Sequence, residues 1–565
     1  MGNKLTITNN FIKITVDRGD TESVMLATQI PYVHKNRINT EFHTTIRNID
    51  LVLKLFRNID PTDVLSLPPS VKHLYLKEMH RRQVTEDLLL NGPKGETVTQ
   101  YITLDPHQQL GVELAEVNDK YAFFYDTRTG KTPMSLAIMA ADIAKNPHHK
   151  WLVLCPLILI ENAWLPDAAQ FFPDLKVVNL HGTTKAQRLK AFKEKGNIYV
   201  ANIESFISYQ EHIEALNVHG AIVDESSVMK SNSSKFGKAA VEYSMTLKRW
   251  YLLSGSPAPN GENEYFRQLQ SVDFYGIHKS YAQFVAHFFV NMSRNPQYEK
   301  LVCRSDRYEE LMGFLRKYSL YVDKEDVLKT PGRDFLEVEL ELPEALKGNY
   351  RELKSNLALE LGNNIVITSP STAANLNKLN QVTSGFVIDT HAMKWNKANP
   401  EGPKMTEQHI LDYYRFIKLN ELLQSLGTKQ AIVWCTYRKE FEIIKTMLGE
   451  RCGLVYGDVN IAEKNTAIRA FKDGSIQFLI ANPASADKGL TLTNAHHAIY
   501  FSLGYSYELW KQSIERIYGD IRKQPERCTY HIFIASGTID RVIYDTVQKK
   551  GDMSTAVLEH LKGGL

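Results

Sequence analysis

The sequence predicts an α/β protein with two parallel-sheet domains, a mostly helical insertion between them and a small α+β domain at the N-terminus. Short apolar strands alternate with helix-like stretches from about residue 96 to 257, and the alternation returns from about residue 410. Such alternation is typical of a parallel sheet covered by helices on both faces. At 565 residues the chain is also too long for one hydrophobic core. The expected domains are 1–95, 96–260, 261–409 and 410–545, followed by a tail helix over 546–565.

The composition is that of a soluble globular protein. Hydrophobic residues make up 43% and charged residues 23% of the chain, and the net charge is only +3. A nucleic-acid-binding surface must therefore come from local clustering of basic residues. The five cysteines are scattered without a C-x-x-C pair, which argues against structural zinc and a disulfide framework and fits a reducing compartment. There is neither a run of about 18 apolar residues nor a signal-peptide layout, so we expect a cytoplasmic protein with no membrane partner.

The N-terminal 95 residues show the pattern of a hairpin followed by two helices. Apolar residues alternate with polar ones on both sides of Asn9-Asn10, which predicts two short strands joined by a turn. Helical spacing follows over 46–56, and a second helix is expected from about Ser70 to Leu90. That second helix presents either a solvated charged face or a face that contacts phosphates. Its basic residues are Lys72, His73, Lys77, His80, Arg81 and Arg82.

The first parallel-sheet domain contains a candidate phosphate loop. The aromatic run Phe123–Tyr125 breaks into a polar loop that ends in Gly130-Lys131-Thr132, and a helical pattern follows. Gly130 lets backbone N–H groups close on an anion, Lys131 supplies a positive charge, and the hydroxyl of Thr132 can hold Mg²⁺. The usual loop has another glycine where this chain has Tyr125. Because Gly-Lys-Thr is common by chance, this interpretation depends on the motifs downstream.

A carboxylate pair follows one of the expected strands of the same domain. Asp224 would hold the metal, and Glu225 would orient or deprotonate the attacking water; a lone Asp-Glu pair is otherwise mostly structural. The loop Ser254–Pro257 ends another strand and either couples the nucleotide site to a second ligand or forms an ordinary turn. Gln108 precedes the loop strand, and its amide can read the adenine edge. The expected strands are Tyr121–Tyr125, Trp151–Cys155, Ile198–Ala201, Ala221–Val223 and Trp250–Leu253, with a helix over Thr184–Lys195.

The remaining chain contains the insertion and the second parallel-sheet domain. Residues 261–409 are mostly helical by pattern, with a few strands such as Phe335–Leu340. A helix is expected over Tyr507–Tyr518, in which Gln512 and Arg516 lie nearly opposite the apolar face. These two residues form either a plain exposed face or one that points across a cleft, where Arg516 would stabilise transition-state charge. The expected strands are Ala431–Trp434, Gly453–Tyr456, Phe478–Ile480, Ala498–Phe501 and Tyr530–Ile534.

Taken in order, these motifs resemble the helicase motif series of superfamily 2, and in particular its Swi/Snf-like branch. The resemblance covers roughly residues 100–545. Ser226 and Ser227, followed by Lys230, are similar to that branch in particular. The motifs are Pro106-His-Gln108, Asp126-Thr-Arg-Thr-Gly-Lys-Thr132, Leu154-Cys-Pro156 with Asn162 and Trp164, Asn202-Ile-Glu-Ser205, Asp224-Glu-Ser-Ser227, Ser254-Gly-Ser-Pro257, Gly489-Leu-Thr-Leu492 and Gln512-Ser-Ile-Glu-Arg516.

The resemblance implies two RecA-like domains, with ATP and Mg²⁺ in the cleft between them and nucleic acid bound across their tops. Catalytic roles fall to Lys131, Asp224, Glu225, Arg516 and Arg522, and Thr132 and Asp224 become metal ligands. The implied nucleotide contacts are Gln108, Thr127, Arg128, Thr129, Gly130, Lys131, Thr132 and Gly489. The implied nucleic-acid contacts are Pro156, Asn202, Ser205, Lys230, Thr436, Tyr437, Ser485 and Thr491, to which the N-terminal domain would add Lys77, Arg81 and Arg82.

Three features depart from the pattern of this family. Tyr125 and Arg128 replace glycines near the phosphate loop. Ser227 stands where many relatives carry histidine. Gly519 stands where the family has its second catalytic arginine. Arg522 is the expected substitute, provided that the helix ends at Gly519 and the chain bends back toward the cleft.

The expected function is an ATP-dependent DNA helicase or translocase that moves on duplex DNA and remodels branched DNA. The compact size and the small N-terminal domain resemble phage branch-migration helicases of the UvsW kind, or annealing helicases. Partners would be duplex DNA, forks and four-way junctions, and the protein would act as a monomer in a bacterial or phage-infected cell. Two alternatives stay open. One is an RNA helicase, and the other is a nucleic-acid-binding scaffold with a weak ATP site.

Overall fold

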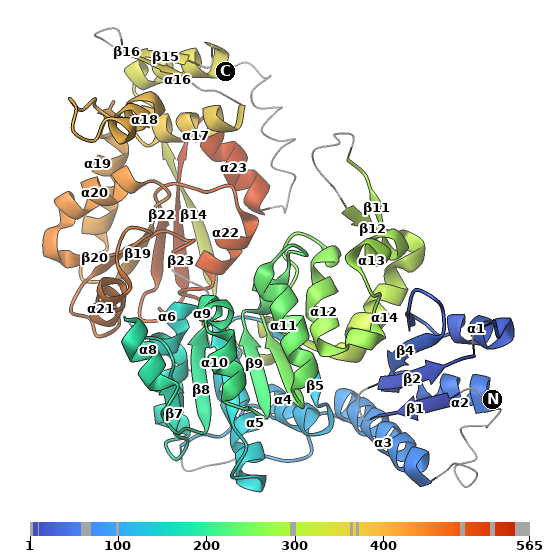
Figure 1. The fold of residues 1–565 in the computed structure, drawn as a ribbon. Helices are drawn as coiled ribbons and strands as arrows, with labels where there is room; N and C mark the ends of the chain where they lie inside the picture. Colours follow the sequence, from blue (N-terminus) through green and yellow to red (C-terminus); the bar gives the residue numbers. More distant parts are fainter. Residues whose placement is uncertain are drawn as a thin grey trace. The chain divides into compact units, whose positions relative to one another are not determined.

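The chain divides into two compact units, Met1–Val327 and Leu328–Leu565 (Figure 1). The computed structural model describes residues 4–8, 11–17, 19–57, 69–97, 101–182, 184–293, 301–356, 358–361, 365–368, 372–485, 492–519 and 526–548. Among the helices of these residues, none combines the length and the apolar character that crossing a bilayer requires. Each unit is built around one parallel sheet, which confirms the predicted α/β class with two parallel-sheet domains.

In its described residues, the N-terminal domain has a four-stranded antiparallel sheet and three α-helices. The strand order is β1-β2-β4-β3, and β1 pairs with β2 in the predicted hairpin, although its turn lies outside the described residues. Ile12, Ile14 and Phe42 on the sheet and Val52 on a helix form its small apolar core. The strands are β1 (Lys4–Ile7), β2 (Phe11–Thr15), β3 (His34–Lys35) and β4 (Glu41–Thr45). The helices are α1 (Thr21–Thr28), a 3-10 turn Ile46–Asn48, α2 (Ile49–Arg57) and α3 (Pro69–Asn91).

The first parallel sheet has seven strands in the order β13-β5-β10-β9-β6-β8-β7. All neighbouring pairs are parallel, so the carboxyl ends of the strands lie along one edge. The five predicted strands are all present, and the edge strands β7 and β13 are additional. The strands are β5 (Lys120–Tyr125), β6 (Trp151–Cys155), β7 (Val177–Asn179), β8 (Ile198–Asn202), β9 (Gly220–Asp224), β10 (Arg249–Leu253) and β13 (Ser319–Val322).

Helices cover both faces of this sheet. On one face α5 contacts α4 and α7, and on the other α11 contacts α9 and α12. These helices are α4 (Pro106–Val117), α5 (Lys131–Lys145), α6 (Leu157–Leu159), a π-helix Ile160–Trp164, α7 (Leu165–Phe171), α8 (Lys185–Ala191), α9 (Ile203–Ser208), α10 (Gln210–Ala215), a 3-10 turn Ser226–Met229, α11 (Lys235–Thr246) and α12 (Phe266–Val272). Beyond α12 the first unit adds α13 (Tyr281–Phe288), β11 (Phe289–Asn291), β12 (Leu301–Cys303), α14 (Tyr308–Tyr318) and α15 (Lys324–Val327).

The N-terminal domain is fixed to the α12–α14 region of the same unit (Figure 1). The hydroxyl of Thr45 donates to Asp273 Oδ2 at 2.6 Å, and the hydroxyl of Tyr32 donates to Glu310 Oε1 at 2.6 Å. The guanidinium of Arg47 donates to the carbonyl of Lys317 and lies 4.4 Å from the ring centroid of Tyr318. Aromatic rings fill the contact between these polar pairs, including Phe11 and His43 against Tyr275.

The second parallel sheet has six strands in the order β14-β23-β22-β19-β21-β20, with all neighbours parallel. Its five predicted strands are present, each within two residues of the predicted bounds at either end. The strands are β14 (Arg333–Leu340), β19 (Ala431–Trp434), β20 (Cys452–Val455), β21 (Phe478–Ala481), β22 (His497–Tyr500) and β23 (Cys528–Ala535). The helices are α16 (Glu344–Asn356), α17 (Thr372–Thr383), α18 (Thr390–Ala398), α19 (Tyr414–Ser425), α20 (Arg438–Leu448), α21 (Ile461–Lys472), α22 (Tyr507–Ile514) and α23 (Ile539–Gln548).

The interval 261–409 contributes an edge strand to each parallel sheet. Strand β13 adds to β5 of the first sheet, and β14 adds to β23 of the second. Residues up to Val327 belong to the first unit and residues from Leu328 to the second. The second unit also contains two small antiparallel strand pairs. They are β15 (Ala358–Leu361) with β16 (Ile365–Thr368), and β17 (Phe386–Ile388) with β18 (Gln408–Ile410).

Candidate functional site

The carboxyl edge of the first sheet brings most of the predicted site residues into one row. The phosphate loop follows β5, the Ser254–Pro257 loop follows β10, and Asp224 ends β9. Pro156 follows β6, and Asn202 ends β8. Because β5, β10, β9, β6 and β8 are consecutive in the sheet, the candidate nucleotide contacts lie on one half of this edge and the candidate nucleic-acid contacts on the other. Ligands of open parallel sheets bind at this edge.

The phosphate loop has the conformation that anion binding requires. Gly130 has φ +80°, and a Cβ there would lie 1.8 Å from the amide nitrogen of Gln108, so glycine is needed at this position. Arg128 also adopts a left-handed conformation, with φ 67°. Lys131 begins α5, and its ammonium donates to the carbonyls of Tyr125 and Asp126 at 3.0 and 3.1 Å. The ammonium of Lys131, which would bind a phosphate, therefore already lies at the loop.

Buried side chains behind the loop hold it in place. The carbonyl of Thr129 accepts from Nε2 of Gln108 at 3.0 Å and contacts the ring of His107 at 2.7 Å. The hydroxyl of Tyr125 donates to the carbonyl of His107 at 2.6 Å, so the aromatic side chain that replaces a glycine points away from the loop. The other end of the Gln108 amide accepts from the backbone N–H of Asp105. The amide of Gln108 thus joins the phosphate loop to the start of α4, and its contact with a base stays a prediction.

The carboxylate pair lies at the end of β9 and is almost fully buried. Glu225 N–H donates to Asp224 Oδ1, and Trp164 Nε1 donates to Asp224 Oδ2, both at 3.0 Å. Burial, followed by the charge of Glu225, raises the pKa of Asp224 to about 6, while Lys131 and the indole bond of Trp164 act in the opposite direction. Glu225 has φ 56°, a strained conformation of the kind found at functional sites. Sequence reasoning gave Trp164 no role, because its spacing does not reveal its partner.

The donors at this edge fit a magnesium ion with a nucleotide. The hydroxyl of Thr132 and the carboxylate of Asp224 are hard oxygen ligands of the kind that Mg²⁺ prefers. The charge of Lys131 lowers the pKa of Asp224 and so favours the ionised carboxylate that would bind the metal. Gly130 is the N-cap of α5, and the N-terminus of a helix favours phosphate oxygens.

The predicted nucleic-acid contacts of the first unit differ in exposure. Asn202 and Ser205 are 7% and 6% exposed, and the hydroxyl of Ser205 donates to the side-chain oxygen of Asn202. The amide nitrogen of Asn202 donates to Glu204 at 2.8 Å. These two residues therefore shape the loop after β8, whereas Pro156 and Lys230 are half-buried at the same edge.

The second unit places Thr436, Tyr437 and Ser485 after neighbouring strands of its own sheet. The buried carboxylate of Glu440 accepts from the backbone N–H groups of Thr436 and Tyr437 at 2.9 and 3.0 Å, and from the hydroxyl of Ser502 at 2.8 Å. Burial raises the pKa of Glu440. Glu440 thus fixes the loop after β19, a role that the sequence did not indicate. The predicted residues Gly489, Thr491 and Arg522 lie outside the described residues.

The helix that carries Arg516 is shorter than predicted. The helix α22 ends at Ile514, so Arg516 lies in the following turn and not on a helical face. Its N–H bonds the carbonyl of Ser513 at 3.1 Å, and its carbonyl accepts from Leu492 N–H at 3.0 Å. Arg516 is 4% exposed, so the plain exposed face is wrong for this residue. The expectation that the helix runs to Gly519 is also wrong.

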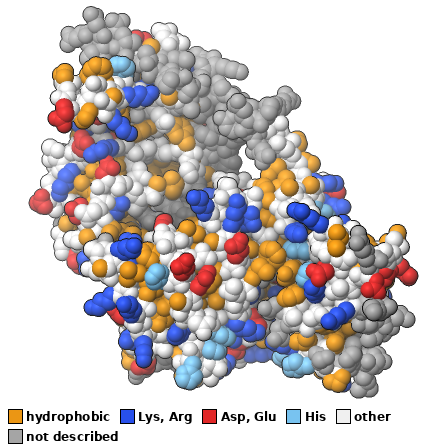
Figure 2. Space-filling model, in the orientation of Figure 1, with side chains coloured by type: hydrophobic (Ala, Val, Ile, Leu, Met, Phe, Trp, Pro, Cys, Tyr) orange, Lys and Arg blue, Asp and Glu red, His pale blue; other side chains and the backbone are white. Residues whose placement is uncertain are grey.

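The basic face of α3 is largely committed to contacts within the protein. Arg81 makes two bonds to Glu78, at 2.7 and 2.6 Å, and a third to Asn118 at 2.8 Å. Arg82 donates to Glu78 and to Asp50 at 2.9 and 2.5 Å. Both charges are paired with carboxylates in the structure, and the phosphate contacts of Arg81 and Arg82 stay a prediction. Lys77 remains exposed on this helix. Elsewhere, basic side chains form several separate groups among acidic and apolar ones (Figure 2).

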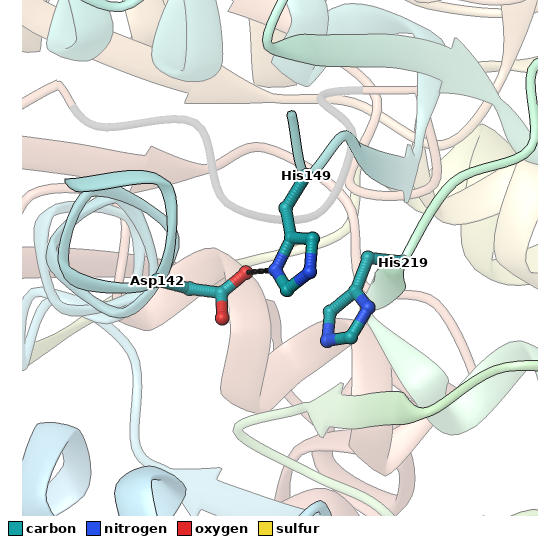
Figure 3. A group of neighbouring side chains, drawn as sticks. All are labelled: Asp142, His149 and His219. Carbon is teal, nitrogen blue, oxygen red and sulfur yellow. Dashed lines mark hydrogen bonds and ion pairs between the residues drawn. The ribbon is translucent and has the colours of Figure 1, made fainter. Parts of the chain in front are cut away.

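A second cluster, at the opposite edge of the first sheet, meets the distances of a metal site. The ligand atoms of Asp142, His149 and His219 lie within 4.8 Å of one another (Figure 3). The two imidazole rings, however, are stacked at 3.5 Å with 10° between their planes. An ion cannot lie in both ring planes at once in this arrangement. Asp142 also accepts from His149 and Trp151 and faces Arg249 at 3.7 Å. The cluster therefore ties α5 to β6.

Comparison with protein families and known proteins agrees with this geometry. A family model described as the SNF2-related domain matches residues 45–388, and one described as the helicase conserved C-terminal domain matches residues 414–518. Protein p41 of Acyrthosiphon pisum secondary endosymbiont phage 1 is 24% identical over 436 residues, which are 73% of this chain and 88% of that protein. The DNA repair and recombination protein RDH54 of Saccharomyces cerevisiae (strain AWRI1631) is 21% identical over 485 residues, covering 77% of this chain and 50% of that protein.

The chain thus spans about half the length of the yeast relative. Among solved structures, the Sulfolobus solfataricus SWI2/SNF2 ATPase core in complex with dsDNA matches 82% of this chain and 96% of its own, at 19% identity and a TM-score of 0.35. The SNF2-related model alone matches more than half of the chain, and the helicase C-terminal model matches much of the remainder. The chain belongs to the SNF2-related family of helicase-type enzymes that hydrolyse ATP.

Proposed function

We propose that the protein is a Mg²⁺-dependent ATPase that moves on duplex DNA and remodels branched DNA. The observation that carries this proposal is the row of loops at the carboxyl edge of the first sheet. Strands β5, β10 and β9 present the phosphate loop and the carboxylate pair, and the adjacent β6 and β8 present Pro156 and Asn202. When a loop in one half of such a row changes its conformation, the neighbouring loops in the other half shift with it. Coupling of hydrolysis to movement on DNA requires such a link.

Each residue of the nucleotide half has a defined role in this proposal. The backbone of the loop up to Gly130 and the ammonium of Lys131 bind the phosphates. Thr132 and Asp224 hold the magnesium ion, which neutralises phosphate charge when it is bound. Glu225 orients the attacking water and accepts its proton. Arg516 has the role of stabilising the charge that develops in the transition state.

Duplex and branched DNA are proposed as substrates, on two grounds. The curated relatives include DNA repair and recombination proteins, by their names. The N-terminal domain adds a surface that the sheet edge lacks, with Lys77, His73 and His80 exposed on α3.

We propose that the protein acts in the cytoplasm of a bacterial cell, because a phage protein is among its relatives and its cysteines form no disulfide. It acts as a monomer in this proposal.

The test is the ATPase rate of the full chain without polymer and with single-stranded DNA, duplex DNA, a fork, a four-way junction or RNA. We expect duplex DNA and branched DNA to raise the rate most, and branched DNA to be remodelled in a gel assay. The variant Lys131→Ala should lose turnover and keep DNA binding. Glu225→Gln should bind ATP and hydrolyse it slowly. Stimulation by RNA alone would favour the RNA helicase instead, and an absence of turnover under all conditions would favour the scaffold.

A further inference from the structure

A fully buried glutamine joins two loops of the candidate site. Gln268 lies on α12 and is 0% exposed. Its side-chain oxygen accepts from the hydroxyl of Ser226 at 2.8 Å, and its side-chain nitrogen donates to the carbonyl of Pro257 at 2.7 Å. The same nitrogen also contacts the carbonyl of Glu264 at 3.3 Å. The amide orientation is defined by these partners, because a hydroxyl can donate to the oxygen and a carbonyl can accept only from the nitrogen.

Both partners of Gln268 belong to loops at the candidate nucleotide site, after β9 and β10. Ser226 directly follows Glu225, the proposed water-orienting residue, and is itself 0% exposed. Pro257 ends the loop that starts at Ser254, and this loop lies on the phosphate loop. A Cβ on Gly255 would be 3.3 Å from the backbone nitrogen of Thr127. One amide therefore connects the carboxylate loop with a segment in contact with the phosphate loop.

The Ser254–Pro257 loop is held again a few residues further on. The carboxylate of Glu264 accepts from the backbone N–H of Asn260 at 3.1 Å and from its side-chain amide at 2.8 Å. Glu264 and Gln268 are four residues apart, a spacing that puts side chains on one face of a helical segment. Together they hold residues 257 and 260, so the segment after the loop cannot shift without moving α12 or breaking these bonds.

We propose that Gln268 is the positioning residue through which DNA binding at the sheet edge accelerates hydrolysis at Glu225. Movement of the Ser254–Pro257 loop reaches Ser226 through the Gln268 amide and sets the orientation of the neighbouring Glu225. This inference rests on the proposed function, since it requires that duplex DNA stimulates turnover. Gln268 touches no nucleotide itself, so its effect appears in the coupling between DNA and hydrolysis.

The test compares Gln268→Met with Gln270→Met in the full chain. Methionine keeps the length and apolar packing of glutamine but removes both hydrogen-bonding groups. Gln270 is a matched control because it is 2% exposed on the same helix, yet it bonds Arg267 and the carbonyl of Lys279. We expect Gln268→Met to reduce the ratio of the duplex-stimulated to the polymer-free ATPase rate about tenfold, as the loss of buried hydrogen bonds allows. Gln270→Met should keep the wild-type ratio.

Two further measurements separate coupling from structural damage. A structural defect reduces both rates in proportion and leaves their ratio unchanged. The smaller change Ser226→Ala should lower the ratio as Gln268→Met does, and the double variant should lower it no further, because both changes break one link. A wild-type ratio in Gln268→Met or Ser226→Ala, or additive losses in the double variant, would overturn the coupling alone. A wild-type enzyme without duplex stimulation would overturn the proposed function as well.

Discussion

At the scale of single residues, we expect the environment of Asp224 to set the acidic limit of the ATPase. Burial and the neighbouring Glu225 raise the pKa of this carboxyl to about 6. A carboxylic acid with a raised pKa stays protonated to higher pH, and the protonated form is a poor ligand for Mg²⁺. The ionised form is therefore gained as pH rises through about 6 and lost as pH falls through it.

We expect the ATPase rate at limiting Mg²⁺ to fall on the acidic side, with a midpoint near pH 6. The bond from Trp164 Nε1 favours the ionised carboxylate of Asp224. Trp164→Phe should therefore move the acidic midpoint of the ATPase rate to higher pH and raise the Mg²⁺ concentration needed for half-maximal rate. Trp151→Phe is the control, because its indole donates to Asp142 at the other edge of the sheet. Identical pH profiles for Trp164→Phe and the wild type would show that the indole does not tune Asp224.

Arg516 illustrates how a single residue depends on the end of an element. Its proposed role is to stabilise transition-state charge, so Arg516→Ala should lower kcat by about 10³-fold or more with little change in ATP affinity. ATP affinity is measured by nucleotide binding, and kcat by steady-state turnover. Lys511→Ala, on the preceding helix, serves as the control for a charge lost nearby. A variant Arg516→Ala with wild-type kcat would exclude the arginine from the reaction.

At the scale of elements, the end of α22 shows why sequence periodicity misplaced Arg516. The carbonyl of Ile514 accepts from the hydroxyl of Tyr530, and the carbonyl of Arg516 accepts from Leu492 N–H. The carbonyl of Ile517 is contacted by the thiol of Cys528. Because partners from β23 and from the segment before β22 satisfy these groups, the helix ends where tertiary contacts replace its own bonds. These partners are far away in the sequence, so the local pattern of apolar residues does not predict them.

The parallel strands, by contrast, were predictable because each is a short apolar run buried on both faces. Trp151–Cys155 and Ala431–Trp434 have the predicted bounds. The strands β7 and β13 were missed because edge strands are short and carry polar residues, such as Asn179 and Ser319. The phosphate loop and the carboxylate pair were predictable from residue types at strand ends. Their buried supports, Trp164 and Gln268, were not, since only the fold brings them to their partners.

The basic helix α3 gives a prediction that separates exposed from paired charges. Lys77→Ala should reduce the slope of log affinity for DNA against log salt by about one unit if this face contacts DNA, because about one phosphate contact is lost. Arg82→Ala should leave that slope unchanged and lower stability instead, since Arg82 bonds Glu78 and Asp50. Salt titrations of DNA binding and thermal unfolding measure the two effects. An unchanged slope in Lys77→Ala would make this face a solvated surface.

At the scale of the whole molecule, the N-terminal domain behaves as part of the first unit. Asp273 accepts from the hydroxyls of Thr45 and Tyr318, at 2.6 and 2.9 Å, and lies 3.8 Å from Nε of Arg47. Removing the carboxylate leaves these groups buried without their acceptor. We expect Asp273→Ala to cost about 3–5 kcal/mol and to loosen residues 4–57 together with α14.

Hydrogen exchange and denaturant unfolding measure this effect. Asp306→Ala is the control, because Asp306 pairs with Arg304 at the surface and such pairs contribute about 0–1 kcal/mol. Exchange in residues 4–57 that stays as slow in Asp273→Ala as in the wild type would show that the domain docks through other contacts. A chain shortened to start near residue 96 would expose the same docking surface, including Tyr275 and Tyr318, and should be less stable for that reason.

The pairing of β13 with β5 has a consequence for how the protein is made. Strand β5 leads into the phosphate loop, and its outer neighbour β13 comes from residues 319–322. At about 5–20 residues per second, a ribosome needs on the order of 10–40 s to extend the chain from one strand to the other. During that interval the edge of β5 that later pairs with β13 has no partner strand. The N-terminal domain likewise lacks α14, the helix against which it docks. We therefore expect the first unit to complete its sheet only after most of it has been synthesised.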